Sequence, residues 1–180
     1  MPLVRWQKNR DDLPLGVGGD GRIVVLPSGT LQVSKVQPSD SATYRCFAEN
    51  PGSSRTGNDA ELKVLAEPGL PRAITFLQRP FDVTTLEGKD AILECSASGY
   101  PNPNFQWMRG SELVQMRSKK YSLLGGSNLL ITRVTDDDSG TYTCVASTKA
   151  ENSSATAELS VMGAKAYPRT IRCKTALTIS

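Results

Sequence analysis

The residues with the widest chemical range in this chain are its four cysteines, Cys46, Cys95, Cys144 and Cys173. A cysteine can ligate a metal, act as a nucleophile or form a disulfide. The sequence contains no histidine and no C-x-x-C pair, so a zinc site would need four scattered cysteines. A cysteine or serine nucleophile would lack the histidine base that usually activates it. The composition therefore favours structural cysteines, and it indicates no metal, no cofactor and no catalytic residue.

The run Asp136-Asp137-Asp138 is a second candidate for metal chemistry. Calcium takes about 6–8 oxygen ligands, and three adjacent residues on a turn cannot all face one ion. No glycine-rich loop opens a helix, so no phosphate site is indicated. The net charge of +3 is small, and the 22% of charged residues mix both signs, which argues against nucleic-acid binding. We therefore expect neither an enzyme nor a nucleic-acid-binding protein.

Two of the cysteines end a string that occurs twice, 98 residues apart, as DSATYRC at 40–46 and DSGTYTC at 138–144. Side chains alternate along a strand, so each string places its Tyr and its Cys on one face. A Tyr two residues before a half-cystine, at the start of strand F, is the tyrosine corner of immunoglobulin-type sandwiches. The repeat predicts an all-β chain of two tandem immunoglobulin-like (I-set) β-sandwiches, with Tyr44 and Tyr142 in their cores.

The second module, residues 73–162, has all the landmarks of a complete domain. Cys95 lies in the alternating run 91–97, a predicted strand B, and Trp107 follows twelve residues later in strand C. This Cys–Trp–Cys order is typical of a buried indole packed against an inter-sheet disulfide. We therefore expect a Cys95–Cys144 disulfide and a buried Trp107, with two buried thiols as the alternative. Strands E, F and G are predicted at 129–134, 142–146 and 157–161.

The first module, residues 1–65, repeats only the later strands. Trp6 matches Trp107, and five residues precede it, so we expect strands A and B to be missing. Strand E would then have an unpaired edge, and Cys46 would have no partner within the module. We expect Cys46 and Cys173 to stay unpaired. A disulfide between them would leave no cysteine unpaired, but nothing in the spacing specifies it.

Each module also carries a basic residue 18 positions before the acid of its predicted E–F turn. A basic residue entering strand D of this fold often reaches that acid. The spacing therefore predicts the ion pairs Arg22–Asp40 and Lys120–Asp138. The alternative is two sets of exposed charges, each contributing less than about 1 kcal/mol.

Residues outside the two modules are predicted to be irregular. Residues 66–72 contain prolines and form a short, semi-rigid linker. Residues 163–180 contain four cations, no acid and no sustained alternation, which predicts a disordered tail. We expect no transmembrane segment and no signal peptide, because no apolar run approaches the required length. A disulfide nevertheless needs an oxidising compartment.

Two surface features suggest binding or modification. Four cations, Arg109, Arg117, Lys119 and Lys120, concentrate around strands C and D and could bind sulfated glycans. The alternative is a solvated strand edge whose lysines discourage edge pairing. Asn152 begins the only N-x-[ST] sequon in the chain, and we expect this F–G turn residue to be a glycosylation site.

Longer stretches of both modules resemble one family, the netrin receptors that include neogenin and "deleted in colorectal cancer". Residues 25–33 (VLPSGTLQV) and 50–58 (NPGSSRTGN) resemble the second immunoglobulin domain of that family. The third domain is similar to residues 76–80, 117–130 and 134–140. The likeness covers about residues 1–162, and within the family it favours neogenin.

The resemblance implies part of a membrane receptor for guidance cues, displayed on the extracellular side of the plasma membrane. Such a receptor acts in cell adhesion and axon guidance through protein–protein recognition, and its partners are guidance ligands or adhesion proteins. In this family four immunoglobulin domains precede six fibronectin repeats, and the repeats engage most of the ligands. The alternatives are a soluble or non-functional truncated product, or an intracellular structural immunoglobulin-domain protein.

Overall fold

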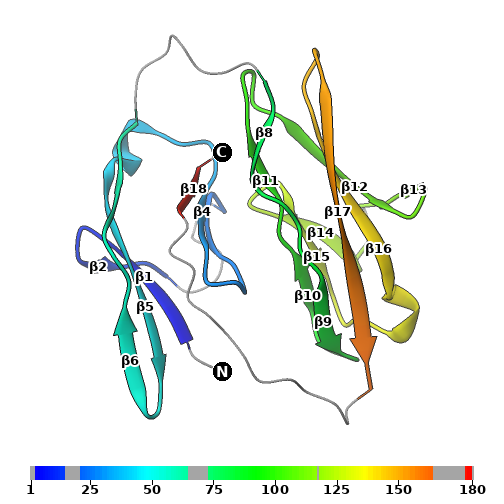
Figure 1. The fold of residues 1–180 in the computed structure, drawn as a ribbon, viewed down its shortest axis with the longest axis horizontal. Helices are drawn as coiled ribbons and strands as arrows, with labels where there is room; N and C mark the ends of the chain where they lie inside the picture. The colour runs from blue at the N-terminus through cyan, green and yellow to red at the C-terminus, as the bar shows by residue number, and fades with distance from the viewer. Residues whose placement is uncertain (1–2, 15–20, 65–72, 117, 164–176, 180) are drawn as a thin grey trace. The chain divides into compact units, whose positions relative to one another are not determined.

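The computed structural model describes residues 3–14, 21–64, 73–116, 118–163 and 177–179. These residues form an all-β fold with two short 3-10 helices, which confirms the predicted fold class (Figure 1). The chain divides into two compact units. Unit 1 contains Met1–Pro68 and Arg169–Ser180, and unit 2 contains Gly69–Pro168. The predicted linker at 66–72 lies outside the described residues.

Unit 2 contains a five-stranded sheet in the order β13-β12-β16-β17-β9. Only β9 runs parallel to its neighbour in this sheet, β17. The strands are β9 (Val83–Leu86), β12 (Asn104–Arg109), β13 (Glu112–Leu113), β16 (Gly140–Ser147) and β17 (Asn152–Met162). The other layer consists of β10 (Ala91–Leu93), β14 (Tyr121–Leu124) and β15 (Asn128–Ile131), with β8 (Thr75–Gln78) and β11 (Ser96–Ser98) paired beside them (Figure 1).

The core of unit 2 lies between these layers and is centred on Trp107, which is fully buried. Trp107 of β12 is directly opposite Cys144 of β16 in the sheet. Cys144 is joined to Cys95 by a disulfide, so the predicted bridge is present. Tyr142 is buried as well. The inner faces of both layers complete this core with Leu93, Leu129, Ile131, Val134 and Leu159.

The predicted strand B at 91–97 is wrong in one respect, because the structure divides it into β10 and β11. The interruption falls at Glu94 and Cys95. The backbone N–H of Cys95 donates to the side-chain oxygen of Asn128 at 2.9 Å, so a side chain replaces a ladder carbonyl at this point. Strand G is also longer than predicted, since β17 begins at Asn152.

Unit 1 has a sheet in the order β2-β1-β5-β6, in which β7 also pairs with β5. Its strands are β1 (Leu3–Lys8), β2 (Asp11–Asp12), β5 (Ala42–Asn50), β6 (Ser53–Thr56) and β7 (Ala60–Leu62). Trp6 of β1 lies opposite Cys46 of β5, as Trp107 lies opposite Cys144 in unit 2. Trp6, Tyr44 and Cys46 are buried together with Leu31, Val33 and Leu62.

A second sheet of unit 1 has the order β18-β4-β3, with β3 (Ile23–Val25), β4 (Leu31–Val33) and β18 (Leu177–Ile179). This pairing corrects two expectations. Residues 177–179 are a strand and not part of a disordered tail, and the edge of the predicted strand E is paired. The segment Leu-Thr-Ile is short but has high β-propensity, and β4 offers it a row of backbone groups. Residues 164–176 and 180 lie outside the described part, and Cys173 is among them, so the expected unpaired state of Cys46 and Cys173 stays a prediction.

Removal of the disulfide should destabilise unit 2 selectively. The bond joins two residues that are 49 positions apart. On the chain-entropy model, closing a loop of this length raises the free energy of unfolding by about 4 kcal/mol. We expect the Cys95→Ala/Cys144→Ala variant to lose hydrogen-exchange protection in β12 and β16, while β1 and β5 keep theirs. Exchange followed by mass spectrometry of peptides from each strand measures this difference. Unchanged protection in β12 and β16 would contradict the role assigned to the bond.

Candidate functional site

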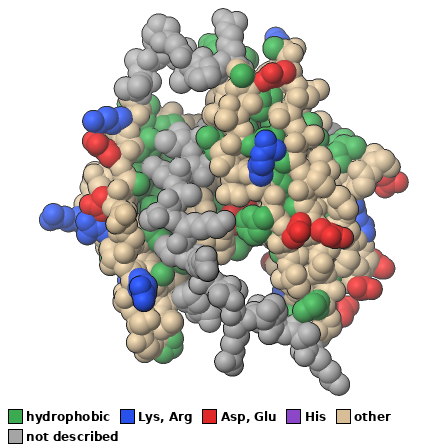
Figure 2. All heavy atoms as spheres, in the orientation of Figure 1, with side chains coloured by type: hydrophobic (Ala, Val, Ile, Leu, Met, Phe, Trp, Pro, Cys, Tyr) green, Lys and Arg blue, Asp and Glu red, His purple; other side chains and the backbone are tan. Residues whose placement is uncertain are grey.

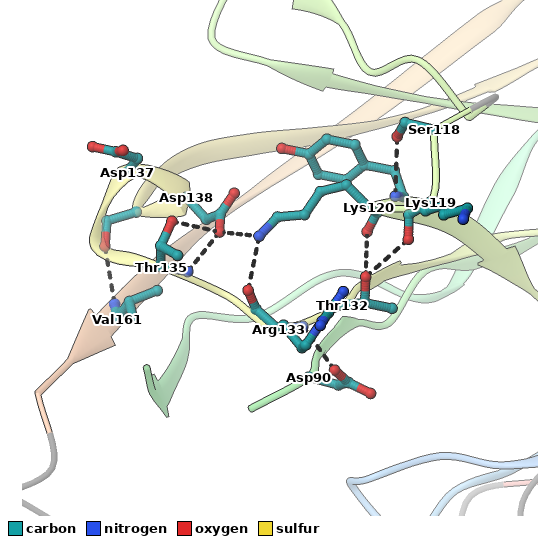
Figure 3. A network of polar contacts seen from close by, with 12 residues as sticks. Asp90, Ser118, Lys119, Lys120, Thr132, Arg133, Thr135, Asp137, Asp138 and Val161 are labelled. Atoms are coloured by element: carbon teal, nitrogen blue, oxygen red, sulfur yellow. Dashed lines mark hydrogen bonds and ion pairs between the residues drawn. The ribbon is translucent and has the colours of Figure 1, made fainter. Parts of the chain in front are cut away.

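A cluster of polar contacts surrounds Asp138 at the end of the 3-10 helix η2 (Asp136–Asp138), directly before β16 (Figure 3). The ammonium of Lys120 donates to Asp138 Oδ2 at 2.6 Å and to the Arg133 carbonyl at 3.0 Å. The backbone N–H and the hydroxyl of Thr135 donate to the same carboxylate oxygen, at 2.7 and 3.2 Å. We call these four residues the lysine clamp.

The local backbone explains why a carbonyl is available to Lys120. Arg133 has φ of 45°, in the left-handed region that non-glycine residues seldom adopt. Several hydrogen bonds hold this turn. Among them, the Arg133 N–H donates to Asp90 Oδ1 at 2.8 Å, and the Thr132 N–H donates to the Lys120 carbonyl at 2.9 Å. The strained residue thus supplies the second acceptor of the ammonium.

Unit 1 contains the same arrangement, which we call the arginine clamp. Arg22 Nη1 donates to Asp40 Oδ2 at 3.0 Å, and the Gln37 N–H donates to the same oxygen at 2.8 Å. Arg22 Nη1 also donates to the carbonyl of Lys35 at 3.3 Å, and Lys35 has φ of 49°. The structure therefore brings together both ion pairs expected from the sequence.

Each clamp also fixes the tyrosine corner beside it. The Tyr44 hydroxyl donates to the carbonyl of Asp40 at 2.8 Å, and the Tyr142 hydroxyl donates to that of Asp138 at 2.9 Å. Burial raises the pKa of both hydroxyls. The tyrosines therefore stay neutral hydrogen-bond donors and do not act as acids near neutral pH.

The two clamp carboxylates have pKa values below their ordinary range. Burial by itself raises the pKa of Asp138, but the hydrogen bonds from Lys120 and Thr135 and the nearby positive charge outweigh it. Burial likewise raises the pKa of Asp40, and Arg22 with the Gln37 N–H outweighs it. Both side chains are almost fully buried, at 3% and 7% exposed for Asp40 and Asp138. Each clamp is thus an ionised pair that secures the turn before β5 or β16, and it is not arranged for proton transfer.

Each indole makes a contact that was not predicted from the sequence. Trp6 Nε1 donates to the carbonyl of Gly29 at 2.9 Å, and Trp107 Nε1 donates to that of Ser127 at 2.8 Å. Gly29 and Ser127 are 98 residues apart, the same offset as the two tyrosine corners. That offset could have identified them, because a buried indole N–H needs an acceptor.

The cations proposed for glycan binding have different surroundings. Arg109 donates to the carbonyls of Asp137 and Ser139, and Lys120 belongs to the lysine clamp. Lys119 is exposed, and Arg117 lies outside the described residues. On the face shown in Figure 2, basic and acidic side chains are scattered and do not form one basic block. Glycan binding by these four residues stays a prediction.

Asn152 is the first residue of β17, next to the turn after β16, and it is exposed. Its position suits an acceptor of glycosylation, which stays a prediction. In the described part of the chain, no helix has the length and apolar character needed to cross a membrane.

Comparison with known proteins agrees with this geometry. The family described as "Immunoglobulin I-set domain" matches residues 1–64 and 74–161. The chain is 64% identical over 162 residues to "Netrin receptor DCC" of Rattus norvegicus, covering 90% of this chain and 11% of that protein. It is 40% identical over 162 residues to "Neogenin" of Homo sapiens, covering 89% of this chain and 11% of that protein.

Solved structures show the same fold. Part of a solved structure of the N-terminal four immunoglobulin domains of Dscam1 superposes with a TM-score of 0.73 at 26% identity, covering 89% of this chain and 46% of that one. The resemblance to netrin receptors is therefore confirmed, although the preference for neogenin within them is wrong. The quoted strings are too short to separate two paralogues, whereas identity over 162 residues favours the other. The chain spans about a tenth of the length of these relatives.

The lysine clamp should give unit 2 a defined acid sensitivity. The pKa of Asp138 is lower in the folded state than in the unfolded state. The ionised carboxylate therefore stabilises unit 2 fully above the unfolded pKa, near 4. This stabilisation is lost as the pH falls through the pKa of the folded state. We expect Asp138→Asn to cost about 2 kcal/mol at pH 7, because it weakens hydrogen bonds to a charged group. Between pH 5 and pH 2, the free energy of unfolding of the variant should also fall less than that of the parent.

Urea denaturation at several pH values, followed by circular dichroism, measures both effects. Asp137→Asn is the matched control, because this neighbouring carboxylate is exposed and should leave stability nearly unchanged. An Asp138→Asn variant as stable at pH 7 as the parent would rule out a stabilising clamp.

Proposed function

Because the chain belongs to the immunoglobulin I-set family and is similar to netrin receptors over both units, we propose that it is the immunoglobulin-domain portion of a guidance receptor. In this role it lies on the extracellular side of the plasma membrane. It acts in cell adhesion and axon guidance by binding proteins, as a recognition module rather than an enzyme.

The extent of the identity is the observation that carries this proposal. Identity at 64% of 162 positions involves many more residues than the buried cores of the two units contain. Core positions maintain a fold, whereas exposed positions provide binding specificity. Similarity this extensive must include solvent-exposed surface, which supports shared recognition as well as a shared fold.

The Cys95–Cys144 bridge supports the extracellular location. Disulfides of this kind persist in oxidising compartments and are rare in the cytosol. The bridge therefore favours a receptor over an intracellular structural immunoglobulin-domain protein. The soluble form is the remaining alternative, and it shares the same surface and the same compartment.

A domain-replacement experiment tests the proposal. The segment of full-length netrin receptor DCC that matches this chain is replaced by residues 1–162, and the chimera is expressed in neurons. We expect the chimera to reach the cell surface and to support netrin-dependent axon outgrowth like the parent receptor, because the exposed residues are largely shared. Surface labelling and axon length are the measurements.

A chimera that also carries Cys144→Ser is the control, and it should remain inside the cell because unit 2 has lost its bridge. A chimera that reaches the surface but supports neither adhesion nor outgrowth would contradict the proposal. Adding the secreted full chain to neurons with the parent receptor examines the soluble alternative. Block of outgrowth would favour that alternative.

A further inference from the structure

The strand β4 of unit 1 pairs with a neighbour along each of its edges. Along one edge it pairs with β3, with Gln32 opposite Val24. The Leu26 N–H donates to the Thr30 carbonyl and the Ser34 N–H donates to the Arg22 carbonyl, both at 2.8 Å. Since backbone groups alternate along a strand, Gln32 also faces β3. Leu31 and Val33 therefore direct their N–H and carbonyl groups to the opposite edge.

That opposite edge is the one on which β18 lies. The pairing is parallel, with Leu177 opposite Leu31, Thr178 opposite Gln32 and Ile179 opposite Val33. Residues 177–179 fall outside the segments that match the I-set family, which end at 161. The strand thus comes from a part of the chain that the family does not account for.

In unit 2 the corresponding edge is paired with β10. Leu129 and Ile131 of β15 lie 98 residues after Leu31 and Val33. They pair with Leu93 and Ala91 of β10, in the antiparallel direction. Because β10 is the first half of strand B, β18 occupies in unit 1 the position that strand B occupies in unit 2, with reversed direction.

The occupied edge borders the core of unit 1. Leu31, Gln32 and Val33 are all fully buried, and Leu31 and Val33 pack with Trp6, Tyr44 and Cys46. A backbone edge beside such a core must be paired or solvated, and an added strand supplies the pairing through main-chain hydrogen bonds.

We propose that the edge of β4 formed by Leu31 and Val33 is a strand-acceptor site, and that Leu177–Ile179 is its donor within the same chain. The donor completes the small sheet of unit 1 by β-strand addition along the edge that, in unit 2, pairs with β10. The site accepts a short extended segment through main-chain pairing, here residues 177–179. This inference does not depend on the proposed receptor function.

The unmodified full-length chain provides the first test. In a parallel pair with this register, backbone protons of Thr178 lie close to those of Leu31 and Val33. We expect nuclear Overhauser effects between these residues in the labelled protein. A mixture of labelled and unlabelled chains distinguishes the donor: contacts within one chain support the proposal, whereas contacts only between chains identify a second copy as the donor and overturn it.

Thr178→Pro in the full chain provides the second test. Proline removes the N–H that a donor strand needs and seldom fits within a sheet, whereas Thr178→Val is a matched control that keeps both the N–H and the β-branch. We expect amide exchange of Val33 to become roughly tenfold faster in Thr178→Pro, as for one lost hydrogen bond. The amide of Gln32, which faces β3, and those of unit 2 should change little.

The outcomes separate the possibilities. Unchanged exchange at Val33 in Thr178→Pro, or absence of contacts from Thr178 to β4 in the unmodified chain, overturns the proposal. If all of unit 1 loses protection in Thr178→Pro while Thr178→Val does not, the donor strand is required for the unit to fold, and the proposal stands. Equal loss in both variants overturns it, because the Thr178 backbone would then be irrelevant.

Discussion

The hydrogen bond of a buried indole is the interaction on which both units depend. Trp6 and Trp107 each pair with a buried cysteine of the neighbouring strand and donate to a carbonyl in the other layer of the sandwich. A buried N–H without an acceptor would cost about 1–3 kcal/mol, so this bond determines the position of the turn before β4 or β15. The spacing of the two layers and the packing of the tyrosine corners follow from that position.

The two units differ in how the strand E edge of the smaller sheet is held. In unit 2 a disulfide joins Cys144 to the segment between β10 and β11, so the layers are linked covalently. In unit 1 the corresponding edge is paired with β18, a segment distant in the sequence. The clamps are alike, although one uses Arg22 and the other Lys120. The turn before strand F is thus conserved between the units, while the connection of strand E differs.

These differences also explain which features the sequence could predict. The tyrosine corners, the indoles and the Cys95–Cys144 bridge depend on strand alternation and fixed spacings, so they are visible in the residues themselves. The division of strand B depends on the Asn128 side chain, and β18 depends on pairing across more than 140 residues. Neither the division of strand B nor the strand β18 produces a pattern in the local sequence. The carbonyls of Lys35 and Arg133 were missed for a related reason, because backbone conformation, not residue type, turns them toward the cations.

The use of charge in the fold limits where this chain can bind other proteins. The cations nearest the turn before strand F are engaged by Asp138 and by backbone carbonyls, so their N–H donors are already partly used within the fold. Two terminal strands of the large sheets, β2 and β13, are two residues long and carry Asp11, Asp12 and Glu112. Short, charged edges resist pairing with another sheet. These two edges are therefore poor sites for pairing with a strand of another protein.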